Sequence, residues 1–70
     1  MNSIIGRYVL KQDHVFAIKG SDMHLVCGSI VKVLDSTEDS VYINFVWFPC
    51  RGYAEWYSKD ILDILERVSD

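Results

Sequence analysis

The feature that most constrains the fold is a pair of alternating segments in the middle of the chain. The first runs from Gly28 to Thr37, and the second, from Val41 to Phe48, has apolar residues at every second position. This alternation is typical of a β-strand with one face in a core. The linking residues 35–40 include no hydrophobic residue, as expected of an exposed hairpin tip. The sequence therefore predicts two long antiparallel strands.

Shorter alternating segments lie on both sides of this hairpin. Residues 6–11, 14–19, 23–27 and 53–57 are expected to form strands. A turn is expected at 19–22, where Gly20 supplies a positive φ at low cost. The whole pattern predicts a mainly β fold built as an antiparallel meander.

The tail after Ser58 leaves two alternatives open. Ser58 can cap a helix that carries an apolar stripe, or the chain can make one helical turn and end as a strand. The stripe of the helical alternative would consist of Ile61, Leu62, Leu65 and Val68.

The length of the chain, 70 residues, predicts a single domain over residues 1–70. A chain of this size buries only about 60% of the surface that its unfolded form exposes. Half of the residues are hydrophobic, and they include two Trp, four Tyr and three Phe. The core needs most of these rings, so a row of rings left outside would mark a contact surface.

Charge and cysteine content restrict the classes of partner and the cellular compartment that we expect for the protein. The chain has seven basic and ten acidic residues and a net charge of −3, which disfavours nucleic acid and anionic membranes as partners. No apolar stretch approaches the ~20 residues that cross a bilayer. Two cysteines and a start without an export signal predict a soluble cytoplasmic protein with reduced thiols.

Metal and catalytic sites are not expected. His14, His24, Cys27 and Cys50 offer zinc-type ligands, but a second pair of closely spaced ligands is missing, which favours free, buried cysteines. The sequence contains no glycine-rich phosphate loop, nucleophile elbow or HExxH helix. We therefore expect no cofactor, no metal and no enzymatic activity.

The acidic hairpin tip has two possible roles. Asp35, Glu38 and Asp39 could attract a basic partner by an effect that weakens with salt, or they could only keep the turn solvated. The second role is favoured, because most charged turns only keep a hairpin tip in contact with water.

Aromatic residues gather in the second half of the chain, and they are the main candidates for function. Two adjacent strands cannot turn all of these rings inward, so one row faces outward or is covered by the first strand or the tail. An outward row would form a flat surface suited to a partner side chain or a cation. The expected partner-binding residues are Tyr42, Trp47, Phe48, Tyr53 and Trp56.

Three segments resemble the SH3-like small β-barrels. The segment from Gly28 to Thr37 is similar to an SH3 strand that leads into a polar hairpin, and Val41 to Phe45 is similar to the next strand. Trp56 to Leu65 resembles the closing segment, in which a strand passes through a 3₁₀ turn into a last short strand. The resemblance implies a five-stranded antiparallel SH3-like barrel with a short C-terminal 3₁₀ or α-helical turn. The implied core includes Val31, Val33, Ile43, Phe45 and Leu62.

The residues that bind proline-rich peptides in SH3 domains are replaced here. Tyr42 follows Val41 where a tryptophan pair would stand, Ser58 replaces a proline, and Ile61 replaces a tyrosine. Looser relatives with this barrel, the Tudor, KOW-type and photosystem I PsaE-like domains, bind methylated peptides, RNA or partner subunits. They remain compatible with the chain.

These observations lead to an expected function. We expect a non-catalytic protein-binding module that acts as an adaptor, regulator or inhibitor through its exposed aromatic face. The alternatives are a barrel that binds RNA or single-stranded DNA by stacking on the same rings, and an accessory subunit of a larger enzyme complex. A short chain of this kind is also typical of phage accessory proteins.

Overall fold

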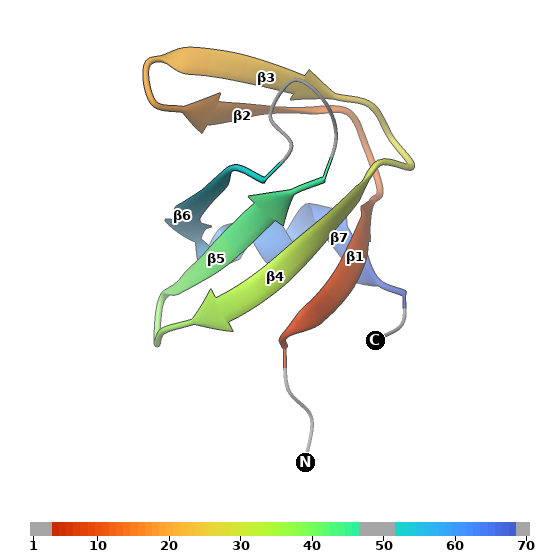
Figure 1. Ribbon diagram of the computed structural model, residues 1–70. Helices are drawn as coiled ribbons and strands as arrows, with labels where there is room; N and C mark the ends of the chain where they lie inside the picture. The colour runs from red at the N-terminus through yellow and green to blue at the C-terminus, as the bar shows by residue number, and fades with distance from the viewer. Residues whose placement is uncertain (1–3, 47–51, 69–70) are drawn as a thin grey trace.

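The computed structural model describes residues 4–46 and 52–68 (Figure 1). Within them, seven strands and one 3₁₀ helix follow one another along the chain. Their bounds are β1 (Gly6–Leu10), β2 (His14–Ile18), β3 (Ser21–Leu25), β4 (Ile30–Ser36), β5 (Ser40–Phe45), β6 (Ala54–Ser58), η1 (Lys59–Ile64) and β7 (Leu65–Arg67). The mainly β prediction is confirmed. In these ranges no helix is both long and apolar enough to cross a lipid bilayer.

The strands of the described residues form two separate sheets. Five of them pair in the order β6-β5-β4-β1-β7, and each neighbouring pair is antiparallel. The other two, β2 and β3, pair only with each other, through a turn in which Gly20 has a φ of +79° as expected. This turn is shorter than predicted, because β3 already begins at Ser21.

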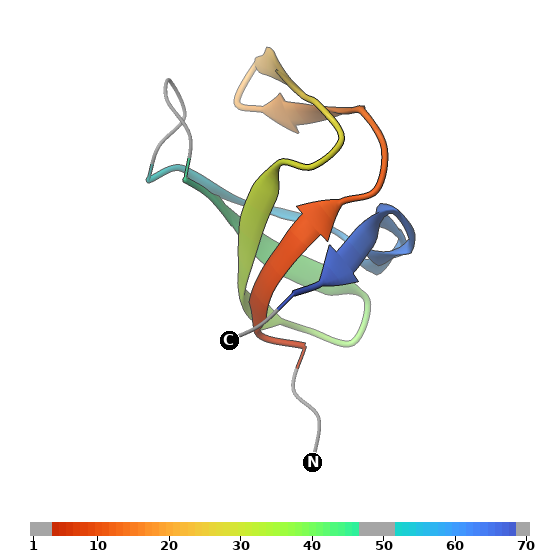
Figure 2. The same cartoon turned by 90° about the vertical axis from the view of Figure 1, so that its right-hand side faces the viewer.

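The expected closed barrel is not formed by these ladders, because the outermost strands β6 and β7 do not pair with each other. The end of β1 is held by bonds from Leu10 N–H to the Ser29 carbonyl and from Lys11 N–H to the Ile64 carbonyl, both 2.8 Å. The chain then turns away into the β2–β3 hairpin. The hairpin base is closed where Asp13 Oδ1 accepts the Cys27 N–H at 2.7 Å. The hairpin lies across one end of the curved sheet (Figure 2). Because the two sheets share no ladder, side-chain packing joins them.

The core lies between one face of the five-stranded sheet and the hairpin with η1. The expected core residues Val31, Val33, Ile43 and Phe45 are all buried, whereas Leu62 is half-buried and packs against the core from η1. Leu65, at the start of β7, is buried. The buried hydrophobic residues are Tyr8, Leu10, Phe16, Ile18, Met23, Leu25, Val31, Val33, Val41, Ile43, Phe45 and Leu65.

A cluster of rings joins the hairpin to the sheet. The Phe16 ring, from β2, meets the rings of Phe45 and Tyr57 edge to face, with centroids 5.1 and 5.3 Å away. Such edge-to-face pairs add about 0.5–1.5 kcal/mol each beyond the area they bury. Because β2 and β3 share no ladder with the sheet, this cluster is a principal attachment of the hairpin.

The tail follows the second of its two alternatives. The Ser58 hydroxyl accepts the Asp60 N–H at 3.3 Å and caps η1, and Leu65 then takes an extended conformation and begins β7. The helical stripe ending at Val68 is wrong, because Leu65–Arg67 pairs with β1 instead of continuing the helix.

Removing the Tyr57 hydroxyl tests the link between hairpin and sheet. This hydroxyl donates to the Ala17 carbonyl oxygen of β2 at 2.9 Å. Tyr57→Phe is expected to lower the free energy of unfolding by about 0.5–1.5 kcal/mol, because the carbonyl loses its partner while the ring stays in place. Urea denaturation followed by circular dichroism measures the change. The matched control is Tyr53→Phe, at an exposed tyrosine before the same strand, and an equal loss in both variants would contradict the prediction.

Candidate functional site

One face of the five-stranded sheet is left open by the rest of the described chain. In Figure 1 this face is turned toward the viewer, while η1 lies behind the sheet and the hairpin lies across its end. We call it the outer face. Because side chains alternate along a strand, the residues next to the buried ones point to this side. Strand register places Arg7, Val9, Ile30, Lys32, Asp35, Tyr42, Asn44, Ala54, Trp56 and Glu66 on the outer face.

Two aromatic side chains lie against each other at the β5–β6 side of this face. Tyr42 and Trp56 are directly opposite in the register, and their rings are 4.8 Å apart between centroids with an interplanar angle of 36°. Trp56 is 44% exposed and Tyr42 is half-buried. We call these two residues the ring pair. Together they present a flat apolar area with a polar atom on each ring.

A bulge in β4 extends the apolar area across the sheet. The register shifts between Val33 and Asp35, so Leu34 is an extra residue and Asp35 is the register partner of Tyr42. Leu34 is 47% exposed. The Asp35 carboxylate accepts the Ser36 N–H at 2.7 Å and so stabilises the backbone at the bulge. The bulge thus leaves an exposed aliphatic side chain between Lys32 and Asp35.

Two cations lie opposite each other farther along the same face. Arg7 in β1 and Lys32 in β4 are register partners, and both are exposed. We call them the cation pair. They border a hollow of about 330 Å³ whose other walls are Ile5 and Leu34, with Gly6 and Val33 between them. Basic groups and aliphatic groups therefore meet in one depression.

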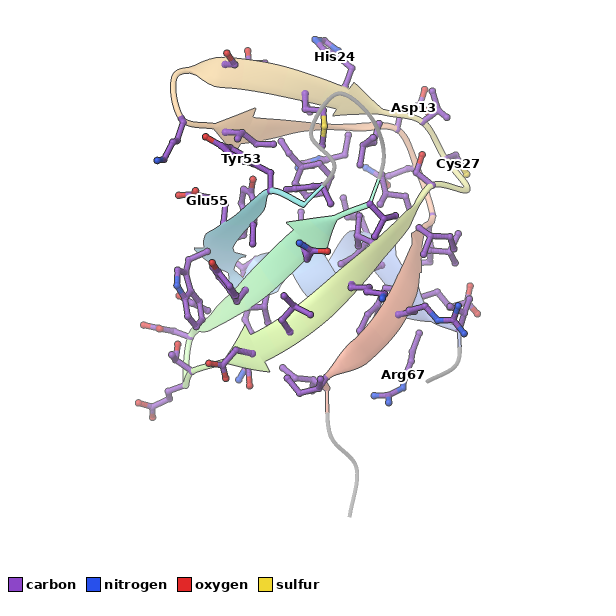
Figure 3. All side chains as sticks on the ribbon, in the orientation of Figure 1. Asp13, His24, Cys27, Tyr53, Glu55 and Arg67 are labelled. Atoms are coloured by element: carbon purple, nitrogen blue, oxygen red, sulfur yellow. The ribbon has the colours of Figure 1, made fainter. Side chains whose placement is uncertain are left out.

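The expected partner-binding residues do not all share this face. Phe45 N–H donates to the Tyr53 carbonyl at 2.8 Å, which continues the β5–β6 pairing and places the Tyr53 side chain on the same side as Glu55 and Tyr57. Figure 3 labels Tyr53, directly before β6, and Glu55, within it. Tyr53 thus points away from the side that carries Trp56. Trp47 and Phe48 lie outside the described residues.

The histidines and the described cysteine are spread over the hairpin. The His14 ring packs edge to face on Phe16 at 4.7 Å, and His24 and Cys27 are exposed. Cys27 was expected to be buried, but it lies on the turn after β3, where its N–H is bonded to Asp13. In residues 4–46 and 52–68, no three His, Cys, Asp or Glu side chains gather as metal ligands would. Cys50 lies outside these residues.

The acidic hairpin tip has a structural role. Asp39 Oδ1 accepts the hydroxyls of Thr37 and Ser40, both at 3.3 Å, which closes the turn between β4 and β5. The Lys59 ammonium, at the start of η1, donates to the carbonyls of Thr37 at 2.7 Å and Glu38 at 3.3 Å. The tip is thereby joined to η1.

Three residues of the outer face were not predicted from the sequence as binding residues: Arg7, Lys32 and Leu34. Lys32 lies on the solvated side of its strand. No local pattern shows that Arg7 lies opposite it, because that depends on the register of β1 against β4.

Searches against models of known protein families, against curated proteins and against solved structures each found no match to this chain. The function must therefore be inferred from the surface itself.

Proposed function

We propose that this protein is a non-catalytic protein-binding module, acting as an adaptor, regulator or inhibitor, and that it binds its partner through the outer face around the ring pair. The observation that carries the proposal is the position of Trp56. Its ring lies 44% exposed against Tyr42 on a sheet face that the described chain leaves open. Tyr53, expected earlier as part of the same surface, is left out of the proposal because it lies on the other side of β6.

The energetics of a small domain support this role. Enclosing one aromatic side chain buries roughly 150–250 Å². A 70-residue chain has few rings available for its core, yet this one leaves Trp56 exposed and Tyr42 only partly buried. Tryptophan and tyrosine are also the residues most enriched at the energetic centres of protein interfaces. Here they are register partners on two paired strands, so little backbone entropy would be lost on binding.

The SH3-like small-barrel superfamily is our proposed classification for the chain. The resemblance implied a strand, a 3₁₀ turn and a last short strand in succession, and β6, η1 and β7 follow one another in this order. The packing of the β2–β3 hairpin over one end of the sheet is compatible with a small barrel closed by side chains instead of by a ladder.

Alanine substitution on the two sides of β6 tests the function. Trp56→Ala is expected to weaken partner binding by about tenfold or more, because a truncated hot-spot residue typically costs more than about 1.4 kcal/mol. Tyr53→Ala should leave the affinity within about twofold, since a contact outside the centre contributes little. Capture with the tagged 70-residue chain, identification of the partner by mass spectrometry and titration of that partner provide the measurement.

The control is Val15→Ala, on the hairpin, where the side chain is 45% exposed. Thermal denaturation of each variant verifies that it is folded. Equal binding by the wild-type chain and a folded Trp56→Ala variant, or failure to capture any protein, would overturn the proposed function.

A further inference from the structure

We infer that the partner adds an extended segment as a new strand along the open edge of β6, with an apolar residue opposite Trp56 and a basic residue opposite Glu55. This inference rests on the proposed function in taking the partner to be a protein, and it names how that partner is bound. Three features of the described structure support it: the unused backbone groups of β6, the exposed ring beside them and the carboxylate of Glu55.

The hydrogen bonds at the two ends of β6 show which of its backbone groups β5 uses. Phe45 N–H donates to the Tyr53 carbonyl at 2.8 Å, and Lys59 N–H donates to the Asp39 carbonyl at 2.9 Å. Bonded and non-bonded residue pairs alternate along an antiparallel ladder. In the register of β5 against β6, the odd-numbered residues of β6 therefore bond to β5 and the even-numbered ones do not.

The backbone groups of the even-numbered residues point away from β5, along the outermost edge of the sheet. They are the N–H and C=O groups of Ala54 and Trp56 and the N–H of Ser58. Among residues 4–46 and 52–68, none of these groups has a hydrogen-bond partner. In Figure 1 this edge is the left-hand side of the sheet. Such a row of donors and acceptors is a template for one more strand.

The β2–β3 hairpin contacts β6 without using this edge. The Tyr57 hydroxyl donates to the Ala17 carbonyl, and the Tyr57 ring packs on Phe16. Both contacts come from a side chain on the inner side of the sheet, opposite the buried Val41 in the register. No ladder joins β2 to β6 among the described strands. The edge of β6 is therefore open to an added strand.

The other outer edges are less suited to strand addition. Proteins protect their edges with short strands and charged side chains. At the opposite side of the sheet, β7 has three residues, of which Glu66 and Arg67 are charged. In the hairpin, β3 exposes Asp22 and His24. The five residues of β6 include a single charged side chain and no proline.

The exposed ring sets the first requirement on the added strand. Residues directly opposite on neighbouring strands have their Cβ atoms roughly 4.5–5.5 Å apart, so their side chains touch. Trp56 is 44% exposed, and its ring already contacts Tyr42 on the β5 side. An apolar residue on the new strand would cover the ring from the other side and remove apolar surface from water.

The outer face itself gives no preference for a charged partner. It carries two basic and two acidic residues, namely Arg7, Lys32, Asp35 and Glu66. Arg7 and Lys32 lie on β1 and β4, and β5 separates both strands from β6. The sign of charge that suits the partner must therefore come from β6 itself.

Glu55 supplies that sign on the inner side of β6. It is half-buried, and it is the charged residue of this strand. Within the described part of the chain its carboxylate forms no hydrogen bond or ion pair, with Lys19 of the hairpin turn or with any other group. A strand added beside it would take more water from the carboxylate, which is costly unless a cation pairs with it. A lysine or arginine directly opposite Glu55 meets this requirement.

Other occupants of the edge fit less well. A second copy that paired its own β6 around Trp56 would place Tyr57 of that copy opposite Glu55, and both carboxylates would stay without a cation. A nucleic acid lacks the alternating N–H and C=O groups of a strand, and it would meet a chain of net charge −3. A protein segment with alternating apolar residues and one basic residue satisfies the backbone, the ring and the carboxylate together.

Peptide selection and amide exchange test the inference. The full 70-residue chain is panned against random peptides about a dozen residues long, roughly twice the usual strand length. We expect enriched peptides with alternating apolar residues and a Lys or Arg next to one of them. On binding, the amide protons of Ala54 and Trp56 should become protected from exchange in the wild-type chain, because the new strand accepts them.

Two substitutions separate the backbone of the edge from its ring. Ala54→Pro removes an N–H that β5 does not use, and a proline is tolerated at such an edge position. It should weaken peptide binding by about tenfold or more, because one bond is lost and the proline ring obstructs the incoming strand. The matched control Ala54→Val has a side chain of similar size and keeps the N–H, so affinity should stay within about threefold. Trp56→Ala removes the ring and keeps the backbone groups.

Charge reversal tests the basic residue of the partner. Glu55→Lys should bind the enriched peptides about tenfold more weakly, and exchanging the peptide's basic residue for Glu should restore binding. The control Glu66→Lys, on the other outermost strand, makes the same change in net charge and should alter affinity by no more than about twofold. Thermal denaturation verifies that each variant is folded, and amide exchange in the wild-type chain decides the matter if Ala54→Pro does not fold.

The possible results distinguish this inference from the proposed function. Peptides that need the Trp56 ring but bind a folded Ala54→Pro variant equally well, and leave the Ala54 and Trp56 amides unprotected, overturn strand addition and leave the proposed function standing. Peptides lost in Ala54→Pro but unaffected by Trp56→Ala support strand addition and overturn the proposed role of the rings. Equal binding by Glu55→Lys, a dimer abolished by Ala54→Pro, or failure to enrich any peptide overturns the inference, while capture of the cellular partner remains the separate test of the function.

Discussion

Replacing Phe45 by alanine is expected to unfold a large part of the protein at room temperature. Phe45 is fully buried, and its ring meets those of Phe16 at 5.1 Å and Tyr57 at 6.2 Å. Truncating a buried phenylalanine costs about 3–5 kcal/mol, because the lost burial is joined by the cost of a cavity. The whole stability of a domain of this size is of the order of 4–10 kcal/mol. Thermal and urea denaturation followed by circular dichroism measure the loss.

The comparison variant is Phe45→Leu, which keeps an apolar side chain at the same position. It should retain more than half of the stability lost in Phe45→Ala, since most of the cavity is filled. Tyr42 lies between the buried residues Val41 and Ile43 of the same strand, but its side chain is on the outer face. Tyr42→Ala should therefore lower the free energy of unfolding far less than Phe45→Ala does. A Phe45→Ala variant with an unchanged melting temperature would mean that the ring does not occupy the core.

Replacing Phe16 by alanine should release the hairpin in addition to lowering the global stability by about 3–5 kcal/mol. β2 and β3 share no ladder with the five-stranded sheet, and an isolated two-stranded hairpin is marginally stable at best. The Phe16 ring supplies two of the contacts that attach the hairpin to the sheet. Amide hydrogen exchange should therefore show a greater loss of protection in β2 and β3 than in β4 and β5.

If Phe16→Ala unfolds the whole protein, the milder variant Phe16→Leu is expected to keep the sheet folded. Hydrogen-exchange protection of β2 and β3 can then be compared with that of β4 and β5 in this variant. Val15→Ala changes the neighbouring residue on the exposed side of β2 and should alter stability by no more than about 0.5 kcal/mol. Equal loss of protection across sheet and hairpin in Phe16→Leu would show that the two parts unfold as one unit.

Strand positions and their buried sides were predictable where apolar and polar residues alternate. Val41, Ile43 and Phe45 are separated by single residues, which identified both the strand and the side that enters the core. The tail was not decided by its pattern, because Ile61, Leu62 and Leu65 fit one face of an α-helix as well as a 3₁₀ turn followed by a strand. Pairing of Leu65 with Leu10 decided it, and this contact joins opposite ends of the sequence.

The aromatic surface was predictable only in part. Tyr53 and Trp56 are three residues apart, and this odd separation places them on opposite sides of an extended chain. The spacing of the two residues in the sequence therefore already indicates that they do not share a face. The pairing of Arg7 with Lys32 had no such signal, because the register of two strands far apart in the sequence depends on the packing of the whole sheet.

The position of β1 between β4 and β7 has a consequence for how this fold is made in the cell. Among the described strands β1 leaves the ribosome first, but β7, which completes its second edge, leaves last, and the bond from Val68 N–H to the Arg7 carbonyl forms only then. Until Leu65 has been synthesised, the nascent domain also lacks one of its buried side chains. The final step of folding must therefore wait for the end of translation of this segment.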